Sequence, residues 1–259
     1  MKFSFQFVIA FLTACITGAI FYLVFRFSSL PVFVIVSLLW FAVLTFFYLA
    51  FQEKRKDHTL LLTLSTALSS LLLFSIIDHS GLRIFFAVFV SLLLGILFGF
   101  RENDTLPLGY ARRPFRRFAM MVWVFNAYAF FSCLFAIGVL FQSEWPRGLE
   151  FVLVPSAGII GALIAGEIWK MYVKGEEKIF LFWRAITGLF IAQIFWSIRL
   201  LPFGYMVSGV LLTWLWYMLQ MLIRFHLREP GIVWKKQLPF LIGSGLVFLF
   251  LFIFYIRWI

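Results

Sequence analysis

Nine apolar runs follow one another along the chain, and they constrain its fold more than any other feature. The runs are 17 to 24 residues long, and short charged connections separate them. A helix needs about 20 predominantly apolar residues to cross the hydrocarbon core of a bilayer. The sequence therefore predicts an all-α, polytopic transmembrane helical bundle of about nine spans, eight at the least. The predicted spans are 3–25, 31–51, 59–77, 84–100, 118–141, 150–172, 179–198, 203–223 and 238–256.

The composition is too apolar for the chain to contain a separate soluble domain. The chain is 64% hydrophobic and 13% charged, whereas a soluble domain is about half apolar and a quarter charged. Residues 1–259 are therefore expected to form a single integral membrane domain. A transmembrane β-barrel would alternate polar and apolar residues along each segment, and these runs are continuously apolar instead.

Pro239 is expected in the first turn of the last span, where a missing backbone N–H is tolerated.

Positively charged side chains gather on alternate connections between the predicted spans. Lys2 and four alternate connections carry 16 Lys and Arg residues, while the remaining connections and the C-terminus carry 5. Positively charged loops are retained in the cytoplasm during insertion. The N-terminus is therefore predicted inside and the C-terminus outside, in the pattern typical of a bacterial cytoplasmic membrane. Most of the net charge of +11 is explained as an orientation signal.

Apart from those at the span ends, two charged residues fall within the predicted spans, and they are Glu167 and Arg184. A charge at membrane depth costs about 2.5–3.5 kcal/mol on insertion scales, so such residues usually pair or serve a function. A short cytoplasmic hairpin joins their two spans, which brings the side chains to matching depth on neighbouring helices. Pairing between Glu167 and Arg184 is the favoured interpretation, because a bidentate contact offsets much of the burial penalty.

The functional alternative is a cytoplasm-facing polar pocket. It would combine Glu167 and Arg184 with Asn126 and Gln220, which also lie in the inner halves of their spans. A proton-coupled transporter could use the carboxylate as a titrating group, and an enzyme acting on a lipid-linked phosphate could use the arginine to hold the phosphate. The sequence leaves both roles open.

A cluster of arginines precedes the fifth predicted span. It consists of Arg112, Arg113, Arg116 and Arg117. Basic residues beside a span attract anionic lipid headgroups at about 1 kcal/mol each, so contact with the lipid bilayer surface and its anionic lipid headgroups is the expected role. Docking of an acidic protein or of a phosphorylated lipid is the alternative. Nucleic acid is not an expected partner, because the basic residues are dispersed over short loops.

Rows of small residues at four-residue spacing predict close contacts between helices, because they allow two backbones to approach in a bilayer. The rows are Ala10, Ala14 and Gly18; then Ala87, Ser91, Gly95 and Gly99; and then Gly158, Ala162 and Gly166. A row of Thr59, Thr63, Thr66 and Ser70 could instead line a hydrated path. The eighth span is aromatic with a polar edge, formed by Trp214, Trp216, Tyr217 and Gln220. Ordinary helix packing is the favoured interpretation of these residues, and the wall of a cavity for a lipid or another apolar ligand is the alternative.

Metal and cofactor chemistry find no support in the sequence. His58, His79 and His226 are isolated near span ends and do not form a set of ligands with metal-binding spacing. Phosphate-binding, metalloprotease and dinucleotide-binding motifs are absent. We therefore expect no cofactor and no metal.

Three roles remain compatible with the sequence. The first is transport or binding of a small or lipidic ligand, the second an enzyme acting on a lipid-linked phosphate substrate, and the third a non-catalytic membrane scaffold. A homo-oligomer or a partner within a membrane complex is compatible with each of them.

Overall fold

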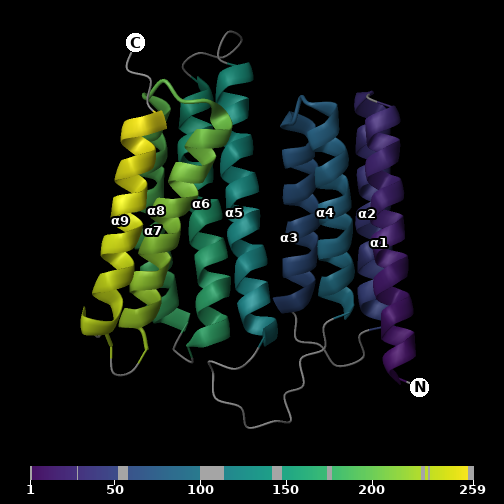
Figure 1. Ribbon diagram of the computed structural model, residues 1–259, viewed down its shortest axis with the longest axis horizontal. Helices are drawn as coiled ribbons and strands as arrows, with labels where there is room; N and C mark the ends of the chain where they lie inside the picture. The colour runs from purple at the N-terminus through teal and green to yellow at the C-terminus, as the bar shows by residue number, and fades with distance from the viewer. Residues whose placement is uncertain are drawn as a thin grey trace. The chain divides into compact units, whose positions relative to one another are not determined.

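The computed structural model describes residues 2–27, 29–51, 58–99, 114–141, 148–173, 177–228, 231–232 and 234–255. Within these residues the chain forms nine α-helices and no β-strand (Figure 1). The helices are α1 (Lys2–Arg26), α2 (Leu30–Phe51), α3 (His58–Ile76), α4 (Ser80–Gly99), α5 (Pro114–Leu140), α6 (Gly148–Tyr172), α7 (Glu177–Arg199), α8 (Tyr205–His226) and α9 (Trp234–Tyr255).

The helices have the length and composition of membrane spans. Among the described helices, seven are long and apolar enough to cross a bilayer, and α3 and α9 contain the shorter apolar segments Leu60–Ile76 and Gln237–Phe250. A helix satisfies its backbone N–H and C=O groups internally, which is what a segment surrounded by lipid requires. The chain is therefore a multi-pass helical integral membrane protein. The number of nine spans and the orientation of the termini stay predictions.

The described helices begin and end within four residues of the predicted spans. The largest differences lie at the starts of α4, α5 and α9, where each helix begins one turn earlier than its apolar run. The expectation for Pro239 is wrong, because this proline lies inside α9. Lys235 and Gln237 are polar but are helix formers, so a helix can continue from the apolar run through them into the headgroup region.

The chain divides into two compact units, Met1–Val122 and Trp123–Ile259, with the boundary inside α5. In the first unit, α1 and α4 pack closely: a Cβ on Gly95 would lie 3.0 Å from the carbonyl oxygen of Ala10 and 3.1 Å from the Cβ of Ala14. The predicted contact between small-residue rows is confirmed here. Phe21 is buried beside them, and its ring packs edge-on against those of Trp40 and Phe74.

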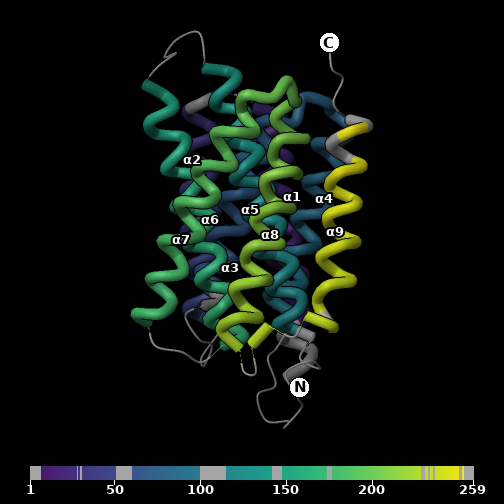
Figure 2. Tube along the Cα trace, turned by 90° about the vertical axis from the view of Figure 1, so that its left-hand side faces the viewer, coloured from purple at the N-terminus to yellow at the C-terminus, as the bar shows by residue number. Residues whose placement is uncertain are grey.

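In the second unit, α8 lies between α7 and α9 (Figure 2). Two buried tryptophans connect α8 to α6, because the indole nitrogen of Trp216 donates to the carbonyl of Gly161 at 2.9 Å and that of Trp169 donates to the carbonyl of Gln220 at 3.1 Å. Both contacts satisfy the one polar group of a large apolar side chain. They hold α8 in a defined position beside α6.

Candidate functional site

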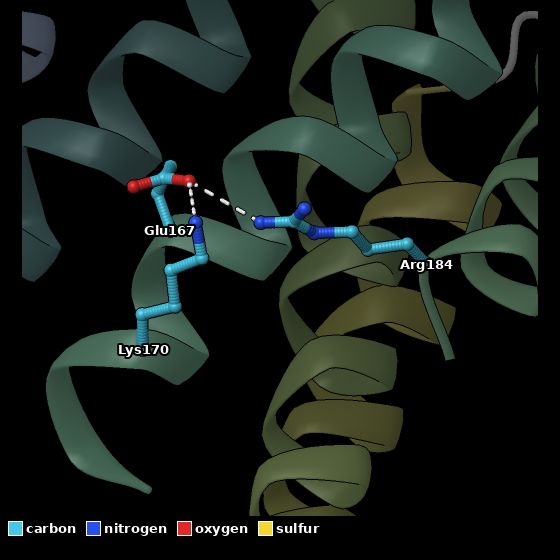
Figure 3. Close-up of polar contacts among 3 residues, drawn as sticks. All are labelled: Glu167, Lys170 and Arg184. Carbon is cyan, nitrogen blue, oxygen red and sulfur yellow. Dashed lines mark hydrogen bonds and ion pairs between the residues drawn. The ribbon is translucent and has the colours of Figure 1, made fainter. Parts of the chain in front are cut away.

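The charged residues at membrane depth form a small cluster on α6 and α7 (Figure 3). The Oε1 atom of Glu167 accepts from the guanidinium of Arg184 at 3.2 Å and from the Nζ of Lys170 at 3.1 Å. The ion pair expected between the two helices is therefore present. Two cations share one carboxylate, so these three side chains together carry a charge of +1.

A glycine makes room for this ion pair. A side chain at Gly166 would overlap the guanidinium of Arg184, whose atoms occupy the space beside that residue. The side chains of Glu167 and Arg184 are 13% and 21% exposed, so the pair is largely withdrawn from its surroundings. The Nε of Arg184 donates no hydrogen bond within the described part of the chain.

A second ion pair lies at the opposite end of the same hairpin. Arg199 near the end of α7 approaches Glu150 near the start of α6, with 3.3 Å between NH1 and Oε1. Between the two ion pairs, Gly158 on α6 lies against the backbone of Gly188 on α7. The two helices are thus joined by charge at both ends and by backbone contact in the middle, which is the arrangement of a structural clamp.

Asn126 and Gln220 are both completely buried, on α5 and α8. The side-chain amide of Gln220 makes no hydrogen bond within the described residues, so it does not bond to the cluster at Glu167. Leaving a buried polar group unpaired costs about 1–3 kcal/mol. The side-chain amide of Gln220 is therefore a buried polar group without a partner in the described part of the chain.

Arg116 and Arg117 lie in the first turn of α5, whereas Arg112 and Arg113 fall outside the described residues. In the polar row of α3, Thr63, Thr66 and Ser70 are buried. The hydroxyl of Thr66 donates to the carbonyl of Leu62 at 2.7 Å, a bond within its own helix. The contact of the arginines with lipid headgroups stays a prediction.

An apolar cavity of about 350 Å³ opens between α5, α8 and α9 in the second unit. This volume lies at the small end of the range for ligand sites. The cavity is lined by Val124, Tyr128, Val210, Thr213, Trp214, Tyr217, Phe240 and Ser244. Of the four residues that offered the eighth span as a possible cavity wall, Trp214 and Tyr217 line the cavity, whereas Trp216 and Gln220 do not. The contributions of α5 and α9 had no signal of their own.

The polar groups of the cavity wall differ in how they are satisfied. The hydroxyl of Tyr128 donates to the sulfur of Met206 at 3.4 Å, and that of Thr213 donates to the carbonyl of Gly209 at 2.7 Å. The indole N–H of Trp214 is buried and has no acceptor among the described residues. An apolar wall with so few polar groups is suited to a mostly apolar ligand.

The first unit contains another cavity of about 330 Å³, between α1, α3 and α4. Its charged residue, Arg83, donates from Nε to the carbonyl of Ile77 and lies over the ring of Phe74, 5.9 Å from its centroid. That guanidinium already has partners within its own unit. The cavity of the second unit is therefore the stronger candidate site.

Comparisons with protein-family models, with curated proteins and with solved structures give no match for this chain. The function must therefore be argued from the chemistry of these sites.

Proposed function

We propose that this membrane protein binds a small, mostly apolar or lipid-like ligand inside the bilayer, for transport or for storage. The observation that carries the proposal is the cavity between α5, α8 and α9, whose lining is apolar apart from a few hydroxyls and the unpaired indole N–H of Trp214. A lipid chain entering from the bilayer would fill this space without desolvating charges.

The proposal assigns the ligand to this cavity and not to the cluster at Glu167. Glu167 and Arg184 bond to each other, and a second ion pair at Glu150 and Arg199 repeats the arrangement at the far end of the hairpin. Groups engaged in this way stabilise the position of α6 against α7. We therefore infer that the charged residues support the ligand site without touching the ligand.

Filling the cavity should abolish ligand binding. Ser244 is buried and lines the cavity from α9, so Ser244→Phe would occupy the space with an aromatic ring. The probe is phosphatidylcholine that carries a photoactivatable diazirine on one acyl chain, in vesicles that contain the purified protein. We expect cross-links to peptides of α5, α8 and α9 in the wild type, and a loss of at least about tenfold in Ser244→Phe, equivalent to 1.4 kcal/mol of binding.

Gly243→Phe is the matched control, because it adds the same ring to the neighbouring residue of α9. A side chain at Gly243 meets open space, and Gly243 does not line the cavity. Its cross-linking should equal that of the wild type. Equal cross-linking of Ser244→Phe and Gly243→Phe would show that the lipid only surrounds the protein and would contradict the proposal.

We further propose that the protein resides in a bacterial cytoplasmic membrane, with its N-terminus inside. The distribution of 16 against 5 basic residues supports this orientation. A reporter enzyme that is active only outside the cytoplasm should be active when fused after Ile259 and inactive when fused after Lys178. The reverse pattern would show that the chain inserts the other way round.

A further inference from the structure

We infer that the first unit holds a second lipid site, a groove along α1 and α4 that takes one acyl chain while Arg83 binds the anionic headgroup of the same lipid. The groove is the cavity of about 330 Å³ in that unit. The inference goes beyond the proposed function, because it assigns a site and the charge of its ligand to the other unit of the chain.

The groove follows one face of each of two helices. Its lining residues run from Arg83 to Leu92 on α4 and from Gly18 to Phe25 on α1, at intervals of one and three residues that return to the same side of a helix. Arg83 and Ser91 are separated by about 12 Å along the axis. One leaflet of a hydrocarbon core of about 30 Å is about 15 Å thick. The groove therefore has the length to hold most of one acyl chain.

The groove is open to lipid from the side. Tyr22, Val88 and Leu92 line it and are exposed, whereas Phe21 and Phe74 also line it and are buried. An acyl chain can therefore enter without displacing a helix. Because lipid tails are as apolar as these side chains, the apolar contact by itself does not select one lipid over another. Any selection must come from a polar group in the wall.

Arg83 is the charged residue of the groove wall. Its Nε donates to the carbonyl of Ile77 and its guanidinium lies over the ring of Phe74, and these two contacts orient the planar group. They engage one nitrogen and one face of the guanidinium. The two terminal nitrogens donate to no acceptor in the described part of the chain. They can therefore bind the oxygens of a phosphate group.

Arg26 lies at the same depth as Arg83. The contacts of Ala14 with Gly95 and of Gly18 with Ser91 show that α1 and α4 run antiparallel, so that four residues forward on one helix match four residues back on the other. Two more turns bring Arg26 level with Arg83. The open end of the groove thus has a second cation beside it.

The charge of this region favours an anion over a second copy of the chain. Asp78, in the turn before α4, is exposed and forms no ion pair with Arg26 or Arg83 among the described residues, so these three side chains carry a net charge of +1. The helices α1, α3 and α4 contain no acidic residue. A second copy packed on this groove would therefore bring arginines together, whereas an anionic lipid neutralises them.

The test uses phosphatidylglycerol and phosphatidylcholine that carry the same photoactivatable diazirine on one acyl chain, in vesicles of otherwise identical composition that contain the purified protein. The readout is the ratio of cross-linking by the two lipids at the groove-lining peptides of α1 and α4. It is divided by the same ratio at residues 35–39 of α2, where Ile35, Leu38 and Leu39 are exposed, which removes the contribution of lipid that merely surrounds the protein. We expect a preference for phosphatidylglycerol of about fivefold in the wild type, the factor that about 1 kcal/mol from one basic residue gives.

In Arg83→Gln the preference should disappear, while cross-linking by phosphatidylcholine stays at its wild-type level. Arg26→Gln is the matched control, because it removes the same charge at the same depth from a residue that does not line the groove. It should keep most of the preference. Arg83→Lys should keep part of it, because the charge remains without the two-nitrogen fork, and this variant separates loss of the headgroup contact from loss of folding.

A preference near one in the wild type would overturn the inference. Equal losses in Arg83→Gln and Arg26→Gln would also overturn it, because the general charge of the surface would then be sufficient. An excess of inorganic phosphate should leave the preference unchanged, and its loss would show that Arg83 binds a free anion instead of a lipid. Cross-links to α5, α8 and α9 report on the proposed function separately, so each proposal can fail without the other.

Discussion

Replacing Gly158 by alanine should destabilise the second unit by forcing two helix backbones apart. A Cβ at this position would lie 2.5 Å from the carbonyl oxygen of Gly188 and 3.2 Å from the Cβ of Ala192. The first of these atoms belongs to the backbone, so α6 and α7 must separate to admit the methyl group. Overpacking of this kind costs about 1–3 kcal/mol. The measurement is the free energy of unfolding in detergent micelles, followed by tryptophan fluorescence.

Gly245→Ala provides the control for this experiment. Gly245 lies inside α9, and a Cβ there meets nothing within 4 Å. Alanine is the better helix former, so this variant should be unchanged or more stable by up to about 1 kcal/mol. If Gly158→Ala were as stable as Gly245→Ala, then α6 and α7 would not pack as closely as described.

Replacing Glu167 by glutamine should have the second large effect. The variant leaves Arg184 and Lys170 beside each other without the carboxylate that both of them contact. Removing one partner of a buried pair costs about 3–5 kcal/mol, and an exposed pair contributes less than about 1. Because Glu167 and Arg184 are partly exposed, we expect a loss between these limits, about 1–3 kcal/mol, in the same unfolding measurement.

Arg184→Gln should cost less than Glu167→Gln. In the arginine variant the carboxylate keeps the ammonium of Lys170 as a partner, so no charge loses its only opposite. The double variant then measures the coupling between the two residues, which should be at least about 0.5 kcal/mol for side chains in contact. Equal stability of all three variants and the wild type, together with a loss of lipid binding, would instead identify Glu167 as part of a ligand site.

The ion pair between α6 and α7 could be predicted because of the short hairpin. Two helices joined by a few residues lie side by side, and ionisable residues at equal depth then meet. The third member, Lys170, was also visible in the sequence at three residues from Glu167, a spacing that places two side chains on one face of a helix. The prediction counted Lys170 among the basic residues of the connection that follows the span 150–172, although Lys170 lies within that span.

The row of small residues around Gly158 predicted a close contact but not its partner. A small residue permits two backbones to approach, and any neighbouring helix can use that opportunity. Gly188, which forms the other side of the contact, stands four residues before Ala192 on α7, a pair of small residues that the prediction did not include. Its role follows from the alignment of the two helices, which the ion pairs at Glu167 and Glu150 help to define.

The chain by itself determined that it is a helical membrane protein, where its helices lie and which two charges, Glu167 and Arg184, lie away from the ends of its apolar runs. Each of these properties is local, since about 20 apolar residues must form a helix to cross a bilayer wherever they occur. The cavity between α5, α8 and α9 was decided only by the tertiary structure. Because lipid tails are as apolar as leucine or phenylalanine, such a side chain gains little free energy by facing a neighbouring helix instead of the bilayer. Which apolar side chains surround a space therefore depends on which helices become neighbours.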